Sequence, residues 1–323
     1  MFLQKTISAV AGAAALAFTV LSAPAHAVQN PNEVKILFSA PTLANPWYMG
    51  VKSGVDAACK ELGIKCETLD AQSNREKQRY DLKNKLLQHD YDAVLASAVD
   101  PLQLKPIYNY AQKKGIITGS LAQTIPHSDL IYTLDEQSYG FTIGLQAAHW
   151  AQKNLKCRGK VAVLTQDDNP VIKARGNGVV EALHEVCPEL EIVARYPADD
   201  TFSGMTILDL LLPRYPDLNL VVSTTDSGGI GGYIIMHANK MGGDKFAVFS
   251  GDATRDALLL MQEPDSIYRG SVDLNPYRCG YESIMSMYDM IQNGAPEEPK
   301  VETFPYVQVS QKMVLSGVFK ATY

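Results

Sequence analysis

A short strand followed by a helix recurs about ten times along this chain, and that repeat constrains the fold most. The segment at 93–97 is apolar up to its last residue, Ser97, which is typical of a strand buried on both faces of a parallel sheet. A helical pattern at 102–114 follows it and ends at Gly115. Strands spaced about 25 to 35 residues apart predict right-handed βαβ crossovers and an α/β fold.

The pattern starts afresh near Asp135, and each of the two series occupies about half of the chain. We therefore predict two similar Rossmann-like lobes, each a parallel sheet flanked by helices, joined by three hinge crossings near Asp135, Leu274 and Gly294. Residues 28–135 and 275–294 are assigned to the amino-terminal lobe, and 136–274 and 295–323 to the carboxy-terminal lobe. Because ligands bind beyond the carboxyl ends of parallel strands, we expect a binding cleft between the lobes.

The amino terminus has the pattern of a secretion signal. Lys5 precedes an apolar stretch at 9–21, and Ala25-His26-Ala27 forms a small-x-small cleavage site. The interpretation is a signal peptide over 1–27, a mature chain that starts at Val28, and a periplasmic location. The alternative is an uncleaved membrane anchor, but the stretch is shorter than the roughly 20 residues that a spanning helix needs.

Charge and cysteine content exclude several classes of function. The formal net charge is −6 and the sequence has no basic stripe, which argues against nucleic acid or anionic lipid as a partner. Among the five cysteines, Cys59 with Cys66 and Cys157 with Cys187 could form disulfides within one lobe each, leaving Cys279 free. The alternative is that all five are buried thiols. No Cys-x-x-Cys is present and the histidines are scattered, so we expect no cofactor and no metal site.

Several short motifs lie at the ends of predicted strands or at the start of the next helix, in a fixed order. They are Leu-Ala-Asn-Pro-Trp-Tyr at 43–48, Tyr-Asp-Ala-Val at 91–94 leading into Ser-Ala-Val-Asp-Pro at 97–101, Ala-Arg-Gly-Asn-Gly at 174–178, Tyr-Pro-Asp at 215–217 before Ser-Thr-Thr-Asp at 223–226, and Ser-Gly-Asp at 250–252. On these motifs the mature chain resembles the type I periplasmic binding proteins of ABC importers, particularly the ribose- and galactose-type group. The resemblance implies the type I periplasmic binding protein fold and no enzymatic activity.

Aromatic and amide side chains after the first strand suit a sugar. Trp47 and Tyr48 offer flat faces that can stack on the C–H face of a sugar ring. Asn45 can donate and accept hydrogen bonds at once, as a hydroxyl group requires. The alternative for the aromatics is that one of them only begins the core stripe of its helix.

In the second lobe, the resemblance implies that Arg175 clamps the sugar and that Asn169 and Thr225 face it. Arg175 has a planar fork that can hold two ligand oxygens; a surface salt bridge is its alternative role. Asp252 follows its strand and could accept from two adjacent hydroxyls, with Arg175 or the ligand pairing its charge. Asp226 is assigned either a ligand contact or the N-cap of the glycine-rich helix.

The chain departs from the ribose and galactose binders at three places. Ser97 stands where an asparagine is common. After 268–273 the chain offers Leu274 or Asn275 where an amide is expected, and Asn275 is the better candidate if the register shifts by one. After the fourth strand the chain has Ser-Leu-Ala-Gln at 120–123, which lacks the family's charged pair. These departures favour a deoxy sugar, a small polyol, a furanose derivative or a sugar-like signal molecule over ribose and glucose.

The predicted function is therefore capture of a sugar or polyol in the periplasm and delivery, as a monomer, to an ABC permease in the inner membrane. The alternative is a sensor subunit that presents its closed form to a chemoreceptor or sensor kinase. An enzyme is disfavoured because no Ser-His-Asp order, histidine cluster or carboxylate pair is apparent.

Overall fold

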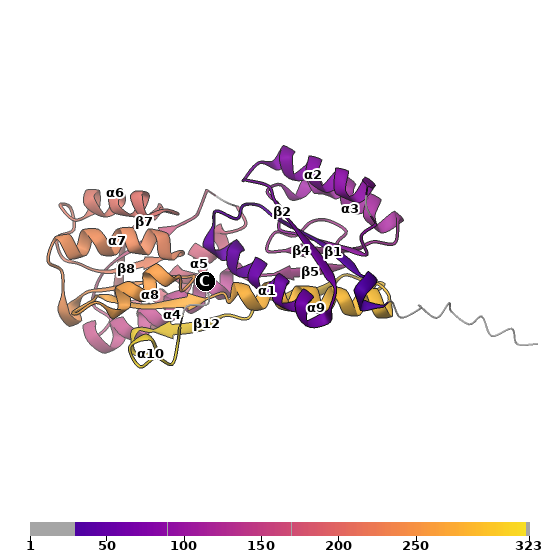
Figure 1. The fold of residues 1–323 in the computed structure, drawn as a ribbon. Coiled ribbons are helices and arrows are strands. Elements are labelled where there is room, and N and C mark those ends of the chain that lie inside the picture. Colours follow the sequence, from indigo (N-terminus) through magenta and orange to yellow (C-terminus); the bar gives the residue numbers. More distant parts are fainter. Residues whose placement is uncertain (1–29, 89, 169, 321–323) are drawn as a thin grey trace, which may run out of the picture.

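The computed structural model describes residues 30–88, 90–168 and 170–320. These residues form two α/β lobes that lie side by side, joined near the middle of the molecule (Figure 1). Each lobe is built around one six-stranded sheet with helices on both faces. The predicted fold class is confirmed.

The sheet of the first lobe is parallel throughout and has the strand order β11-β5-β4-β3-β1-β2. Helices α1 and α9 cover one face, and α2 and α3 cover the other, since their buried residues fall into two separate clusters with the strands between them. The strands are β1 (Lys35–Ala40), β2 (Lys65–Asp70), β3 (Ala93–Ala96), β4 (Ile117–Leu121), β5 (Leu130–Thr133) and β11 (Lys300–Thr303), and the helices are α1 (Pro46–Leu62), α2 (Arg75–Gln88), α3 (Pro101–Lys113) and α9 (Pro276–Asn293).

The sheet of the second lobe has the order β12-β10-β9-β8-β6-β7, with β12 antiparallel at its edge. Helices α4 and α5 cover one face, while α6, α7, α8 and α10 cover the other. The strands are β6 (Gly159–Thr165), β7 (Leu190–Pro197), β8 (Leu218–Ser223), β9 (Ala247–Phe249), β10 (Tyr268–Asp273) and β12 (Val307–Ser310), and the helices are α4 (Glu136–Leu155), α5 (Lys173–Val186), α6 (Thr201–Leu211), α7 (Asp226–Ala238), α8 (Arg255–Gln262) and α10 (Gln311–Leu315).

Two short 3₁₀ turns, η1 (Pro31–Glu33) and η2 (Gly243–Lys245), complete the elements of the described residues. Strands β1, β3 and β4 run parallel in one sheet, and β6, β8 and β9 run parallel in the other, so their carboxyl ends lie at one edge of each sheet. In both lobes this edge faces the junction of the lobes (Figure 1). This arrangement places the loops that follow these strands around the interlobe space.

The chain crosses between the lobes three times, at 134–135, 274–275 and 304–306. The last crossing corrects the prediction, which ended the first lobe at Gly294. Gly294 only caps α9, and the chain then adds β11 to the first sheet by parallel pairing with β5 before it crosses. Strand β11 is a short, largely exposed edge strand, so it lacks the apolar pattern by which the other strands were found.

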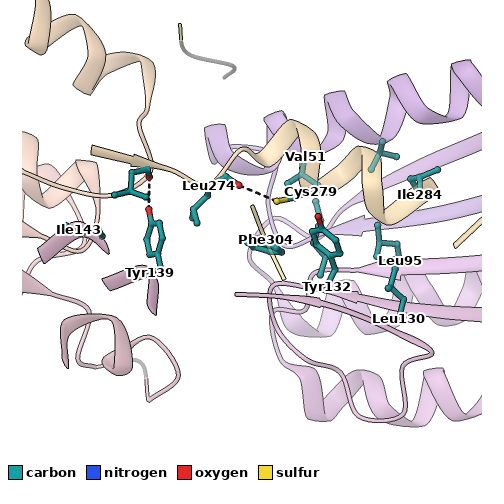
Figure 2. Close-up of a cluster of buried hydrophobic side chains, with 14 of the residues drawn as sticks. Val51, Leu95, Leu130, Tyr132, Tyr139, Ile143, Leu274, Cys279, Ile284 and Phe304 are labelled. Carbon is teal, nitrogen blue, oxygen red and sulfur yellow. Dashed lines mark hydrogen bonds between the residues drawn. The ribbon is translucent and has the colours of Figure 1, made fainter. Parts of the chain in front are cut away.

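Hydrophobic packing continues through the crossings (Figure 2). Phe304 lies in the third crossing and packs against Tyr132, with ring centroids 5.4 Å apart. Leu274, in the second crossing, accepts a hydrogen bond at its carbonyl from the thiol of Cys279, 3.3 Å away. In the second lobe the Tyr139 hydroxyl donates to the carbonyl of Val272 at 2.8 Å. The crossings are therefore anchored in the core on both sides.

Helices α1 and α9 approach closely because glycines lie at their contact. A Cβ atom on Gly54 would lie 1.8 Å from the carbonyl oxygen of Tyr277, and one on Gly280 would lie 2.0 Å from that of Val51. Neither distance is compatible with a side chain, so these two positions require glycine.

Both predicted cysteine pairs are joined in the structure. Cys59 at the end of α1 is bonded to Cys66 in β2, with Cα atoms 6.1 Å apart, and Cys157 after α4 is bonded to Cys187 at the end of α5, with Cα atoms 4.9 Å apart. Cys279 is a buried free thiol. Each bridge closes a loop inside one lobe, so neither restrains the lobes relative to each other.

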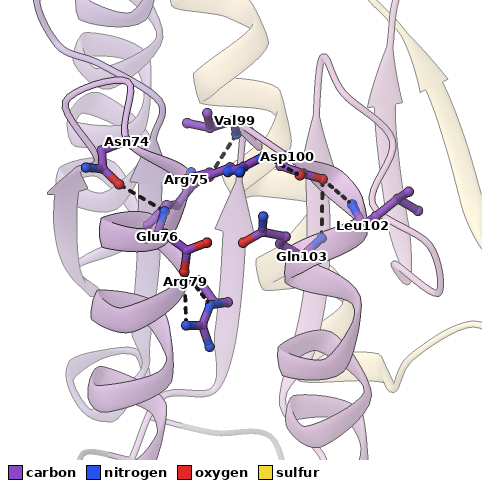
Figure 3. A network of polar contacts seen from close by, with 9 residues as sticks. Asn74, Arg75, Glu76, Arg79, Val99, Asp100, Leu102 and Gln103 are labelled. Atoms are coloured by element: carbon purple, nitrogen blue, oxygen red, sulfur yellow. Dashed lines mark hydrogen bonds and ion pairs between the residues drawn. The ribbon is translucent and has the colours of Figure 1, made fainter.

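Asparagine and aspartate side chains cap the helices that begin near the cleft (Figure 3). Asn74 accepts hydrogen bonds from the first backbone N–H groups of α2, and Asp100 does the same for α3. Arg75 at the start of α2 reaches Asp100 at 3.9 Å. These contacts hold the loops after β2 and β3 in fixed positions.

Candidate functional site

A cleft of about 650 Å³ lies between the lobes, and both lobes and all three crossings contribute to its lining. The first lobe supplies Thr42, Ala44, Asn45, Trp47, Tyr48, Ser73, Ala122 and Gln123, and the crossings supply Leu134, Leu274 and Phe304. The second lobe supplies Glu136, Gln166, Ile172, Arg175, Asp199, Thr201, Thr225, Ser227, Ile230, Asp252, Thr254 and Asp256. Six of the ten predicted site residues line this cleft: Asn45, Trp47, Tyr48, Arg175, Thr225 and Asp252.

One wall of the cleft is aromatic. Trp47 lies edge-on to Tyr48, with ring centroids 4.9 Å apart, and 5.7 Å from Phe304 of the third crossing. Asn45 holds the start of α1, and with it the backbone of Trp47, in place. It is the N-cap of the helix, and its side chain accepts a hydrogen bond from the Trp47 backbone N–H at 2.8 Å. Both predicted aromatics therefore line the cleft, and both also pack against the hydrophobic core.

Ser97 supports the aromatic wall instead of lining the cleft. Its hydroxyl donates to the Tyr48 hydroxyl at 3.3 Å, and the residue is fully buried. Burial raises the pKa of Tyr48, and the Ser97 hydrogen bond acts in the other direction. Gln78 of α2 holds the same loop by donating to the Ser97 carbonyl and accepting from the Val99 N–H, each at 2.8 Å.

Arg175 lies in the first turn of α5 and is almost completely buried. Its Nε donates to Glu136 at 2.7 Å, and one terminal nitrogen donates to the carbonyl of Thr224 at 3.1 Å. The guanidinium also stacks 4.8 Å above the ring of Tyr139. These contacts fix the fork while leaving some of its five donors for a ligand. The salt bridge envisaged as the alternative role does form, but it is buried in the cleft.

Asp252 follows β9 and projects into the cleft from a strained backbone, with φ at +107°. Its N–H donates to the Val272 carbonyl at 2.8 Å, which ties the loop to β10. Burial, followed by the negative charge of Asp226, raises the pKa of Asp252 from 3.8 to about 8, whereas Arg175 acts to lower it. Positive φ at a non-glycine residue costs free energy and is common where a side chain must be aimed at a ligand.

Asp226 lies beneath the cleft and is fully buried. The hydroxyls of Ser250, Ser271 and Tyr268 donate to one carboxylate oxygen, and the backbone N–H and hydroxyl of Thr254 donate to the other. It is not the N-cap of α7, contrary to the alternative considered above, because that place belongs to Thr225. Asp226 therefore positions the loop around Asp252 and adds negative charge below it.

Two further predicted residues differ in their placement. Thr225 lines the cleft, and its hydroxyl also accepts a hydrogen bond from the Gly228 N–H at 3.3 Å. The same side chain therefore caps α7 and is exposed to a ligand in the cleft. Asn275 does not line the cleft: it is the N-cap of α9 in a left-handed conformation, and its side chain accepts from the Arg278 N–H. Asn169 lies outside the described residues.

Sequence reasoning missed Glu136, Gln166 and Phe304. Glu136 directly follows Asp135, the N-cap of α4 at the first crossing. Its place next to a crossing could have identified it as a residue that lines the cleft. Gln166 directly follows β6, as other cleft residues follow their strands. Among the described residues, five buried side-chain atoms lack a hydrogen-bond partner. Two of them, the Oε1 of Gln166 and the Nε1 of Trp47, belong to residues that line the cleft, where a ligand can pair with them.

Two α/β lobes joined by three crossings, with a polar and aromatic cleft between them, define a class of proteins that bind a small solute between lobes. Residues 36–295 match the family model described as periplasmic binding protein domain. The chain belongs to this family, as its resemblance predicted.

Curated relatives include a ribose import binding protein from Bacillus subtilis (strain 168), 27% identical over 237 residues that cover 72% of this chain and 74% of the relative. A D-allose-binding periplasmic protein from Escherichia coli (strain K12) is 24% identical over 271 residues, covering 78% and 83%. The fold matches a periplasmic ribose ABC transporter structure from Conexibacter woesei, with a TM-score of 0.78, 20% identity, and coverage of 90% of this chain and 96% of that one. It also matches a Caulobacter myo-inositol binding protein with a TM-score of 0.73, 20% identity, and coverage of 90% and 97%.

Family membership confirms that the chain is a periplasmic solute-binding protein and not an enzyme. The predicted signal peptide, 1–27, lies outside the described residues. Within the described part of the chain, no helix has the length and apolar character to cross a membrane. In the same part, no three His, Cys, Asp or Glu side chains are grouped so that they could hold a metal ion.

Proposed function

We propose that this protein captures a sugar or sugar-like polyol between its lobes and delivers it to an ABC permease in the inner membrane. The observation that carries the proposal is the opposition of the aromatic wall, Trp47 and Tyr48, to Arg175 and Asp252 on the other lobe. A sugar ring offers an apolar face to the aromatics and hydroxyls to the charged groups, so only a closed cleft satisfies both sides of the ligand.

The binding proteins for ribose and D-allose among the relatives support this ligand class. We propose further that the protein acts as a monomer, because one chain supplies both walls of the cleft. The closed form is the species that the permease would bind. A chemoreceptor or sensor kinase could bind the same form, and capture experiments with the ligand-loaded protein would distinguish these partners.

The test is a thermal-shift screen of the mature protein against pentoses, hexoses, deoxy sugars and polyols. A ligand that binds only the folded state stabilises it by about 2.7 kcal/mol at a hundredfold excess over its dissociation constant. We expect one chemical class to raise the midpoint and Arg175→Ala to abolish the shift. Arg158→Ala is the matched control, because Arg158 is an exposed arginine that pairs with Glu189 away from the cleft.

A midpoint that no sugar or polyol raises would contradict the proposed ligand class. A shift that survives in Arg175→Ala, or that Arg158→Ala removes equally, would contradict the assignment of the cleft.

A further inference from the structure

The two walls of the cleft differ in charge. The described residues that line it from the first lobe and from the crossings are all uncharged. The second lobe contributes four carboxylates, Glu136, Asp199, Asp252 and Asp256, against one guanidinium, that of Arg175. This single cation is already bound to Glu136 at 2.7 Å. The lining therefore carries a surplus of negative charge that is confined to one side.

The environment of Asp252 indicates a negative potential at the floor of the cleft. The charges of Asp226 and Glu136 both act to raise its pKa, in addition to the effect of burial, and Arg175 compensates only in part. Tyr139, beneath Arg175, also has its pKa raised, first by burial and next by the charge of Asp252. With a pKa of about 8, Asp252 mostly keeps its proton at pH 7 in the empty cleft. A positive charge brought to this floor would be stabilised because Asp252 would release that proton and pair with it as a carboxylate, whereas a negative charge would be repelled.

The charged hydrogen-bonding groups of the second lobe are mostly acceptors. Its lining has four carboxyl groups, against the donors of Arg175 that Glu136 and Thr224 leave open and the hydroxyls of four serine and threonine residues. Carboxylates only accept, and the unpartnered buried atom of Gln166 is its Oε1, another acceptor. On the opposite wall the unpartnered buried atom is the Nε1 of Trp47, which only donates. A matching ligand therefore offers more donors than acceptors to the second lobe, keeps one acceptor for the remaining donors of Arg175, and offers an acceptor to the first lobe. A hydroxyl donates one hydrogen, whereas an ammonium group donates three and accepts none.

We propose that the cleft takes a hydroxylated ligand that carries a positive charge, such as an amino sugar, with its ammonium group toward the second lobe and its ring against Trp47. This inference rests on the proposed function, because it names the class of ligand for the same cleft. Charge-assisted hydrogen bonds from an ammonium to buried acceptors are about twice as strong as those from a hydroxyl. The same charge distribution excludes sugar acids and sugar phosphates.

The experiment uses ligands in matched sets that differ in one substituent. D-glucose, D-glucosamine and D-glucuronate form the first set, and the corresponding galactose compounds form the second. Affinities are measured by isothermal titration calorimetry with the mature, disulfide-bonded protein. We expect the amino sugar to bind at least about tenfold more tightly than its neutral parent, the lower end for a hydrogen bond to a charged group. The acid should bind most weakly.

A neutral parent that equals or exceeds its amine, or an acid that binds as well, would overturn this inference and leave sugar binding intact. If neither the matched sets nor the wider sugar screen shows binding, the proposed function falls and this inference with it. The two failures are therefore distinguishable.

A variant of Asp252 tests whether this residue causes the preference for an amino sugar over its neutral parent. Asp252→Asn keeps the shape of the side chain but cannot ionise beside an ammonium group, so we expect the ratio of amine to neutral affinity to fall at least about threefold. Asp209→Asn, on the exposed face of α6 and outside the cleft lining, is the control and should keep the wild-type ratio. An unchanged ratio in Asp252→Asn would contradict the charge argument even if the amine remains the better ligand.

Discussion

The raised pKa of Asp252 makes a prediction about stability as well as about binding. In the folded, empty protein, burial and the charge of Asp226 raise this pKa from 3.8 to about 8. Between these two values the unfolded chain has lost the proton that the folded protein retains. The free energy of unfolding therefore falls as the pH rises through this window. Asp252→Asn removes the titrating group, so the variant should escape that loss.

The magnitude follows from the width of the window. At pH 7 the group lies about three pH units above its unfolded pKa, which sets a ceiling of about 4 kcal/mol at 1.36 kcal/mol per unit. Asp252 is not completely buried, and Arg175 compensates part of its charge. We therefore expect Asp252→Asn to stabilise the ligand-free protein by about 1–2 kcal/mol at pH 7, a rise in Tm of several degrees.

The assay is differential scanning calorimetry of the ligand-free wild type and variant from pH 4 to pH 8 at fixed ionic strength. The two proteins should melt together near pH 4, and the variant should melt progressively higher as the pH rises. Asp209→Asn, an exposed carboxylate on α6, controls for removal of one charge and should show no such trend. A difference in Tm that does not change with pH, or a variant that is less stable at pH 8, would refute the reasoning.

Three other predictions concern the packing and the clamp. Arg175→Ala leaves the carboxylate of Glu136 in the cleft wall without its cation, so it should lower the free energy of unfolding, measured with urea, by about 3 kcal/mol. Adding Glu136→Gln should restore part of this stability but should not restore ligand binding. Gly280→Ala brings a Cβ to 2.0 Å from a backbone carbonyl of α1 and should destabilise by at least about 1–3 kcal/mol, whereas Gly242→Ala meets no atom within 4 Å and should stay within about 0.5 kcal/mol. Cys157→Ser opens a bridge that spans 30 residues and should lower the free energy of unfolding by about 3 kcal/mol, which calorimetry with and without the substitution would measure.

The sequence was most informative where local patterns and tertiary structure agree. The buried strands of both sheets are short apolar runs, and their alternation with helices along the chain predicts that they pair in parallel. Arg175 was assigned from the family resemblance, whereas the cleft residues Trp47 and Asp252 were found because they follow strands or begin the next helix. That position places a side chain at the carboxyl edge of a parallel sheet, whatever its partners are.

The errors occur where the position depends on contacts distant in sequence. Strand β11 pairs with β5 across the edge of the sheet, and its exposed residues carry no pattern that reveals this. Phe304 reaches the cleft only because the chain crosses after β11, and Glu136 matters only because α5 brings Arg175 to it. Asn275 was assigned to the ligand by its distance after β10, but the turn into α9 commits its side chain to capping.

The two lobes offer different kinds of contact to a ligand, and this difference explains how ligand binding can be coupled to closure of the cleft. The aromatic wall of the first lobe contributes contact area, whereas the charged wall of the second contributes directional hydrogen bonds. Arg175 is held by Glu136, Thr224 and Tyr139 before any ligand arrives, so little conformational entropy is lost when a ligand binds to it. A ligand bound to one wall alone leaves its other face in water. The closed form gains free energy only when one molecule contacts both walls, and a ligand with an apolar face and a charged, donor-rich edge makes that difference largest.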